Sequence, residues 1–339
     1  MTEAAQLDAL LHGAAFAQIT DRAFLRVTGA DATRWLNGMV TNNVAALAPG
    51  EGNYNFLLNA QGRIQGDCTI YREPGDGPAT FLLETQNSQL ETIHKTLDHF
   101  IIMDDVELAR LSMFGLLIIG TKAHQRCLEV SLPYPGFSGE ELPTEPFHGK
   151  MYYGEVDFGR RIALCPPSLD PKQTIEQVEL WNSDIEDIRR VERQLVDHAG
   201  TSPVSPETLE AFRIYSGTPK FGVDIRDRDL PQETGQTHAL HFSKGCYLGQ
   251  EIVERIRSRG QVHRQFTQFT LTGEMPQTFP APIEANGKAA GELTSAAQIG
   301  DTIYALGYAR REALDTHQPL TYLGGTATPL ATGKLETGN

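Results

Sequence analysis

One eight-residue stretch constrains this chain more than any other part of it. The stretch reads KGCYLGQE, from Lys244 to Glu251, and two glycines, Gly245 and Gly249, bracket a Cys-Tyr pair. Glycine allows a positive φ or a close approach of the backbone to a ligand, so we expect Cys246 on a tight bend rather than inside a regular element. The fold must therefore accommodate an irregular segment that carries a thiol.

Basic residues surround this cysteine in the sequence, and three of them stand at alternate positions in the following segment, IVERIRSRGQVHR. The basic set is Lys244, Arg255, Arg257, Arg259, His263 and Arg264. Nearby cations favour the thiolate over the thiol, which raises nucleophilicity and metal affinity. The alternative is a structural turn with a half-buried cysteine and a solvated basic strand, because buried thiols mostly only pack.

KGCYLGQE fits the pattern K-G-C-[FY]-x-G-Q-E, and the chain thereby resembles the YgfZ-type folate-binding proteins. These proteins are relatives of the glycine-cleavage T-protein, an aminomethyltransferase, and they serve iron-sulfur cluster assembly and repair. The resemblance covers roughly residues 7 to 330, including N-x-x-G-R in a hairpin, R-x-x-x-G-x-P-x-x-G-x-D from Arg213 to Asp224, and GYAR at 307–310. It implies an α+β, T-protein-like folate-binding fold, with mixed α/β subdomains around a central cavity and a C-terminal β-barrel.

The hydrophobic pattern changes near Gln265, which divides the chain into two predicted domains. Residues 1–262 form the T-protein-like folate-binding module, with two intertwined subdomains, and short strands between Gly and Pro turns indicate a β-barrel over 263–339. In the first domain we expect helices at 5–16, 32–40, 87–100, 123–130, 173–196 and 206–216. We expect strands at 19–27, 53–58, 63–71, 80–84, 106–120 and 152–165, and a polar loop at 131–150.

The resemblance also implies residues that face the folate. The T-protein family carries tandem acids on one strand, and one of them acts on folate-bound one-carbon chemistry. Here the pair is Gly66-Asp67. If Asp67 has no such role, a lone aspartate in this strand is expected to be solvated. Asn87 matches a position that faces the pterin, or it caps a helix. Tyr215 stands where the family usually has a glutamate, so Glu233 or another acid would supply the missing acceptor, unless Glu233 is only a loop acid.

Composition argues against several classes of function. Lys and Arg number 29 against 43 Asp and Glu, and the resulting net charge of −14 argues against broad binding to nucleic acid or anionic membranes. No apolar run approaches the roughly 18 residues that span a membrane. The acidic start, MTEAAQLDALL, lacks the basic region of a signal peptide.

The four cysteines are widely separated in the sequence. They are Cys68, Cys127, Cys165 and Cys246. Without a C-x-x-C pair we expect neither a disulfide framework nor a closed zinc site, and reduced thiols indicate a cytoplasmic protein. We expect no metal site within the chain itself, and an iron-sulfur cluster held through Cys246 would be shared with a partner.

The function implied first is that of a tetrahydrofolate-binding accessory protein in iron-sulfur cluster assembly or repair. Folate would occupy the cavity with Cys246 near its mouth, and a transient, shared cluster would be the second cofactor. Iron-sulfur scaffold or carrier proteins are the expected partners. Around Cys246, we expect Lys244 and Tyr247 to shape the approach to the thiol and Gly245 and Gly249 to form the turn. Gln250 and Glu251 are expected to hold the loop by hydrogen bonds. The expected contacts to the carboxylate tail of the folate come from Arg255, Arg257 and Arg259.

Two alternatives stay open. One is a folate-dependent aminomethyl or one-carbon transferase with Asp67 in a catalytic role. Gly66 and Tyr215 argue against it. So does the KGCYLGQE motif, here called the hallmark, because true aminomethyltransferases lack it. The other is a binding module for a protein partner or for tRNA, related to tRNA modification, with the arginines as its docking face; the acidic net charge makes nucleic acid the least expected partner.

Overall fold

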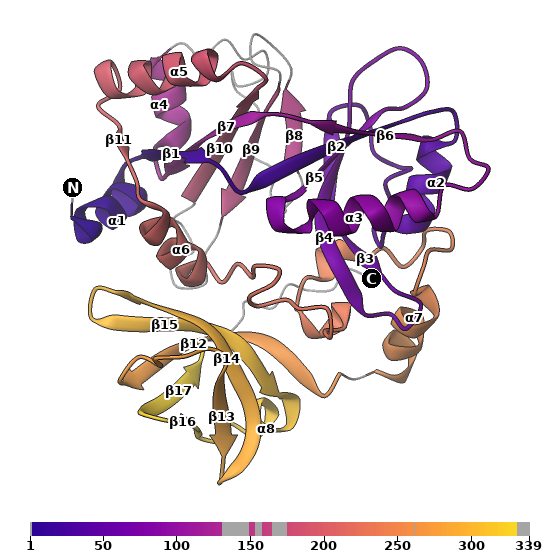
Figure 1. The fold of residues 1–339 in the computed structure, drawn as a ribbon. Helices are drawn as coiled ribbons and strands as arrows, with labels where there is room; N and C mark the ends of the chain where they lie inside the picture. The colour runs from indigo at the N-terminus through magenta and orange to yellow at the C-terminus, as the bar shows by residue number, and fades with distance from the viewer. Residues whose placement is uncertain (1, 131–148, 153–157, 165–174, 261, 331–339) are drawn as a thin grey trace.

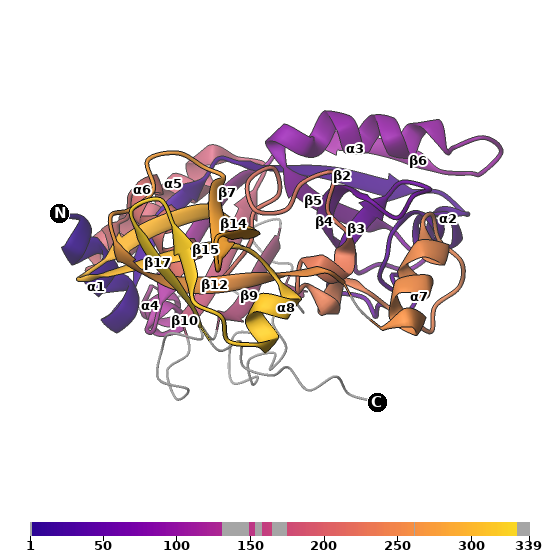
Figure 2. The same cartoon turned by 90° about the horizontal axis from the view of Figure 1, so that it is seen from below.

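A computed structural model describes residues 2–130, 149–152, 158–164, 175–260 and 262–330. It consists of a body of strands and helices and, beside the body, a small barrel (Figures 1 and 2). Helix α6 (Pro206–Tyr215) contacts both the body and the barrel strands β14 and β15, whose bounds follow below. Helices and strands are mixed throughout the body, which confirms the predicted α+β class.

The body is organised by one eleven-stranded sheet in the order β11-β1-β7-β10-β9-β8-β3-β4-β5-β2-β6. Consecutive strands β1 and β2 lie far apart in this order, so the chain crosses between the two halves of the sheet early. The strands are β1 (Ala15–Ile19), β2 (Arg22–Thr28), β3 (Glu51–Leu58), β4 (Ile64–Arg72), β5 (Phe81–Gln86), β6 (Glu107–Leu111), β7 (Phe114–Gly120), β8 (Gly149–Tyr152), β9 (Phe158–Leu164), β10 (Ile175–Asn182) and β11 (Ser202–Pro203).

Helices cover this sheet, and polar side chains fix where several of them begin. Besides α6, the helices of the body are α1 (Glu3–His12), α2 (Ala32–Met39), α3 (Asn87–His99), α4 (Ala123–Glu129), α5 (Ile185–Asp197) and α7 (Gln250–Arg259). The Ser205 hydroxyl accepts a hydrogen bond from Thr208 N at the start of α6, and Pro206 occupies the first helical position, as the sequence predicts. Ile188, Val191 and Leu195 of α5 are buried against strands β7 and β10.

The predicted C-terminal barrel is confirmed. Six strands close in the order β12-β15-β14-β13-β16-β17 around a core of aromatic, branched and small residues such as Phe269, Leu293 and Ala305. Closure leaves no free sheet edge. The strands are β12 (Arg264–Gly273), β13 (Ala281–Ala285), β14 (Lys288–Ile299), β15 (Thr302–Arg310), β16 (Leu320–Tyr322) and β17 (Gly325–Pro329), and the short helix α8 is Arg311–Asp315.

Three elements differ from the sequence prediction. The predicted helix at 173–196 is wrong in its first half, because Ile175–Asn182 is the strand β10, paired on both sides with β7 and β9. This two-sided ladder outweighs the helix propensity of its Glu and Leu residues. Ala15 and Phe16, predicted to end a helix, begin β1. The basic segment after the hallmark is the helix α7 rather than a strand, and most of the predicted loop at 131–150 lies outside the described residues.

Candidate functional site

Cys246 lies on an irregular loop and its side chain is exposed, as the glycine-rich hallmark predicts. Cys68 and Cys127 are both buried, and Cys165 lies outside the described residues. Among the described cysteines, therefore, Cys246 alone is open to a partner. The loop runs from the short 3-10 turn at Thr237–Ala239 to the start of α7 at Gln250.

Lys244 anchors this loop on the N-terminal side of the thiol. Its ammonium Nζ donates hydrogen bonds to the carbonyl oxygens of Val40 (2.7 Å) and Asn42 (2.6 Å), and it lies 5.1 Å from the centroid of the Tyr247 ring. Burial lowers the pKa of Lys244 from 10.5 to about 7, because the charged form loses its solvation. The amine therefore points into the body.

Tyr247 and Gln250 anchor the loop on the C-terminal side. The Tyr247 ring is buried in an apolar cluster with Phe56, Leu58 and Val253, and burial raises its pKa to about 12. The Tyr247 N–H donates to Gln250 Oε1 (3.3 Å), so Gln250 holds the loop as the sequence predicts. With both neighbouring side chains buried, Cys246 projects from a fixed backbone.

The two glycines of the hallmark have different structural roles. Gly249 has φ +82°, and a Cβ there would lie 2.6 Å from the carbonyl oxygen of Asn59. Gly245 has no positive φ, and nothing lies within 4 Å of its Cβ direction. The tight turn therefore needs glycine at Gly249 alone.

We predict that Gly249→Ala lowers the free energy of unfolding by about 2 kcal/mol, since a left-handed backbone and a backbone clash both oppose the methyl group. Chemical denaturation followed by far-ultraviolet circular dichroism measures this loss. Gly245→Ala is the matched control and should leave the midpoint within error. Equal midpoints for both variants would contradict the assignment of the turn to Gly249.

The arginine-rich segment that follows the loop forms helix α7. In α7, Arg255 and Arg259 are one turn apart, whereas Arg257 points away from that face. Arg255 is exposed, the Arg257 guanidinium lies 4.4 Å from the Phe242 ring centroid, and the side chain of Arg259 is outside what the structure describes. Lys244 is directed into the body and Arg257 stacks on an aromatic ring, and the cationic setting of Cys246 stays a prediction.

A cavity of about 950 Å³ lies within the body, at the position that the resemblance implies. Its walls come from β1, β4, β5, β7, β10 and α6, and apolar side chains such as Phe16, Ile19 and Leu117 cover much of them. Three buried carboxylates face this apolar space, and they are Asp67, Glu84 and Glu179. Acids buried among apolar walls are typical of a binding site rather than of a structural core.

Asp67 is buried, so its expected solvation is wrong. Its carboxylate accepts hydrogen bonds from Tyr54 Oη (2.5 Å) and from Gln89 Nε2 (2.7 Å), and Gln89 Oε1 in turn accepts from the Asp67 N–H. Burial raises the pKa of Asp67, although both hydrogen bonds act in the opposite direction. A Cβ at Gly66 would lie 3.1 Å from side-chain atoms of Gln89 and Ile93, so an acid at this position would require both to shift.

Glu84 and Glu179 were not predicted from the sequence. Glu84 accepts from Arg22 Nε (3.2 Å) and Tyr71 Oη (3.3 Å). Glu179 accepts from Gln177 Nε2 (2.6 Å) and Trp181 Nε1 (3.4 Å). The available signal was a glutamate that directly follows apolar residues within a strand, in FLLET and VELW.

The other residues that the resemblance implied lie outside the described lining of this cavity. Asn87 is the first residue of α3 after its N-cap Gln86, and its amide donates to Thr20 O (2.7 Å). Tyr215 packs edge-on against Tyr304, with ring centroids 5.0 Å apart. Glu233 pairs with Arg264 (3.2 Å) near the barrel. Glu251, Arg255 and Arg257 also lie outside the lining, so the structure does not bring the predicted folate contacts together.

Cys246 is likewise outside the described lining, but the loop and the cavity share a structural connection. The buried ring of Tyr247 belongs to the same apolar cluster that Tyr54 packs against, and the Tyr54 hydroxyl reaches Asp67 inside the cavity. In the part of the chain that the structure describes, no group of three or more His, Cys, Asp or Glu side chains is placed to hold a metal ion. Within the same part, no helix is long and apolar enough to cross a membrane.

Comparison with known proteins finds one matching domain family and several relatives of this chain. Residues 3–131 match the model of the GCVT N-terminal domain. A mitochondrial iron-sulfur cluster assembly factor IBA57 homolog of Pyricularia oryzae is 25% identical over 325 residues, which cover 94% of this chain and 71% of that protein. Mitochondrial IBA57 of Mus musculus is 24% identical, with 81% and 73% covered. A Neurospora crassa homolog is matched over 58% of its length.

These relatives contradict one expectation from the sequence, that of a cytoplasmic protein, since they are named mitochondrial. Scattered cysteines indicate reducing conditions, which do not single out the cytoplasm. The YgfZ type stays a prediction.

A solved structure establishes the fold. Glycine cleavage system aminomethyltransferase T from Bartonella henselae superposes with a TM-score of 0.80 at 17% identity, over 97% of this chain and 88% of that one. The chain therefore has the fold of the glycine-cleavage T-protein, and its residues 3–131 match the GCVT N-terminal domain.

Proposed function

We propose that this chain is a tetrahydrofolate-binding accessory protein in iron-sulfur cluster assembly or repair. The observation that carries the proposal is the exposed thiol of Cys246 on a loop whose neighbours, Lys244 and Tyr247, are both anchored in the body. Relatives that match most of this chain are named iron-sulfur cluster assembly factors, which supports the same role.

In this role the iron-sulfur cluster is the substrate, and the thiol of Cys246 acts on it. Thiolate sulfur is a soft ligand suited to iron-sulfur centres, and a single cysteine cannot hold a cluster without other ligands. In the proposed exchange, an iron of the incoming cluster gains the Cys246 sulfur while its bond to one scaffold thiolate breaks. The proton of Cys246 passes to the released thiolate, so the number of protons and of iron-sulfur bonds is unchanged.

The cavity fits a folate by size and by chemistry. Its volume of about 950 Å³ lies within the range of small-molecule sites, roughly 300–1,000 Å³. The apolar walls suit a flat ring system, and the carboxylates of Glu84 and Glu179 are acceptors for the N–H groups of a pterin. They supply the kind of acceptor that the sequence lacks at Tyr215. Bound tetrahydrofolate would supply a carrier of one-carbon groups.

The test of this site is calorimetric titration with tetrahydrofolate. We expect saturable binding to the unchanged chain, and binding about ten-fold or more weaker to Glu179→Gln, because a charge-assisted hydrogen bond contributes ~1.5–3 kcal/mol. Glu186→Gln, on the exposed face of α5, is the matched control and should bind as the unchanged chain does.

Two outcomes would overturn the proposed site. One is the absence of saturable heat, and the other is equal affinity of Glu179→Gln and the unchanged chain. Formation of methylene-tetrahydrofolate from an aminomethyl donor, lost in Asp67→Asn, would favour the transferase alternative, for which the burial of Asp67 in the cavity speaks.

A further inference from the structure

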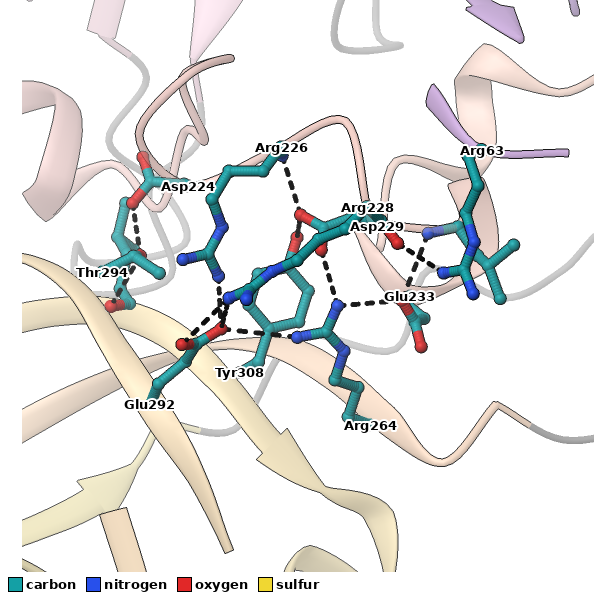
Figure 3. Close-up of polar contacts among 12 residues, drawn as sticks. Arg63, Asp224, Arg226, Arg228, Asp229, Glu233, Arg264, Glu292, Thr294 and Tyr308 are labelled. Carbon is teal, nitrogen blue, oxygen red and sulfur yellow. Dashed lines mark hydrogen bonds and ion pairs between the residues drawn. The ribbon is translucent and has the colours of Figure 1, made fainter. Parts of the chain in front are cut away.

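A second hollow, of about 690 Å³, lies where the body meets the barrel, and it shares no described lining residue with the folate cavity. Three parts of the chain converge there: the turn after β3, the loop at 224–233, and the barrel strands β12, β14 and β15 (Figure 3). Its charged lining is Arg63, Arg228, Arg264, Arg310, Glu233 and Glu292.

The lining has an excess of positive charge. Four guanidinium groups face two carboxylates, although the whole chain carries a net charge of −14. Asp229 adds a third carboxylate behind the lining, and Arg226 adds a fifth guanidinium. The lining itself is therefore two charges positive on a strongly acidic protein, which indicates a site for an anion.

Ion pairs fix the inner arginine before any ligand binds. Arg264 reaches Asp229 (2.5 Å), Glu233 (3.2 Å) and Glu292 (3.4 Å), and its guanidinium lies 4.6 Å from the ring centroid of Tyr308 (Figure 3). Asp229 is fully buried and also accepts from the Arg226 N–H (2.8 Å). A guanidinium held in this way presents its donors with little loss of side-chain entropy on binding.

Two outer arginines have no carboxylate partner among the residues that the structure describes. Arg63 donates to the backbone carbonyl of Arg228, which is not a charged group. Arg310 has no carboxylate partner among the described residues, and it stands directly opposite Arg264 on the neighbouring strand. Like charges opposite each other on paired strands are destabilising, so a bound anion would relieve this arrangement.

We propose that this hollow binds a small ligand with two or more closely spaced oxyanion groups, either phosphates or carboxylates. Both groups accept paired hydrogen bonds from guanidinium. Ala289 and Gly291 line the same hollow and contribute no large side chain to it. The proposal does not depend on folate binding or on Cys246.

Calorimetry with inorganic pyrophosphate and with a triglutamate peptide, at constant ionic strength and without metal ions, tests this site and distinguishes the two ligand sources. We expect at least one probe to bind with one-to-one stoichiometry, and the affinity to fall by about ten-fold or more in Arg63→Gln and in Arg310→Gln. Both side chains are exposed, so neither variant should unfold. Arg311→Gln, next in the chain but paired with Asp315, is the control that should bind normally.

Binding of pyrophosphate alone would assign a phosphate ligand, and binding of triglutamate alone a polycarboxylate one. Absence of saturable binding by both probes would overturn the proposal. So would equal losses of affinity in Arg310→Gln and Arg311→Gln, because general surface charge would then explain the binding.

Discussion

Replacement of Cys246 by serine is expected to reduce cluster transfer to the rate seen without the protein. The hydroxyl is a hard and weak ligand for iron, so the exchange with a scaffold thiolate cannot proceed through it. The side chain is exposed and the loop is held by Lys244 and Tyr247, so the variant should fold and melt as the unchanged chain does. Visible circular dichroism of a cluster moving from a loaded scaffold protein to an apo enzyme measures the rate.

A displaced thiol provides the control for this prediction. Ser243→Cys in the Cys246→Ser background places a thiol three residues earlier, also on an exposed position but on the other side of the Lys244 anchor. We expect it not to restore transfer, because the position of the sulfur is fixed by the anchored backbone. Full transfer by Cys246→Ser alone would remove the thiol from the mechanism.

The second large effect concerns Lys244 and pH. Its pKa is about 7 in the folded chain against 10.5 as the ordinary value, because burial disfavours the ammonium. Between these values the unfolded chain binds the extra proton, so raising the pH stabilises the fold. Below pH 7 both states hold the proton, and above the ordinary value both have lost it. The gain therefore builds up from about pH 7 towards pH 10, at up to about 1.4 kcal/mol per pH unit.

Urea denaturation at pH 6 to 10 measures this slope, and Lys244→Met removes it. We expect the curves of free energy against pH to run parallel below pH 7 and to separate steadily above it. Lys288→Met, on the exposed surface of the barrel, is the matched control and should keep the slope of the unchanged chain. Parallel curves for Lys244→Met over the whole range would show that the buried amine keeps its ordinary pKa.

The sequence predicts the fold well where local patterns decide it. The hairpin of β3 and β4 follows from two alternating runs and a turn, and the barrel follows from short strands between Gly and Pro turns. Strand β10 was missed because its identity depends on neighbours distant in the sequence, β7 and β9. Helix α7 was missed although glycine stands at both of its ends, with Gly260 at φ +87° as a helix stop.

The candidate site was likewise predictable from the sequence only in part. The loop around Cys246 was predictable, because glycine chemistry and residue order are local properties. Glu84 and Glu179 could not be assigned to the cavity from the sequence, since an acid within a strand is usually solvated and only the packing of the sheet reveals its burial. Arg310 gains its role in the proposed anion site only through its register opposite Arg264.

The proposed role can be tested by the rate of cluster transfer from a loaded scaffold protein to an apo iron-sulfur enzyme, with and without the purified chain. We expect the unchanged chain to accelerate transfer and Cys246→Ser not to do so. Equal rates with the unchanged chain, with Cys246→Ser and without either would contradict the proposed role in iron-sulfur cluster assembly.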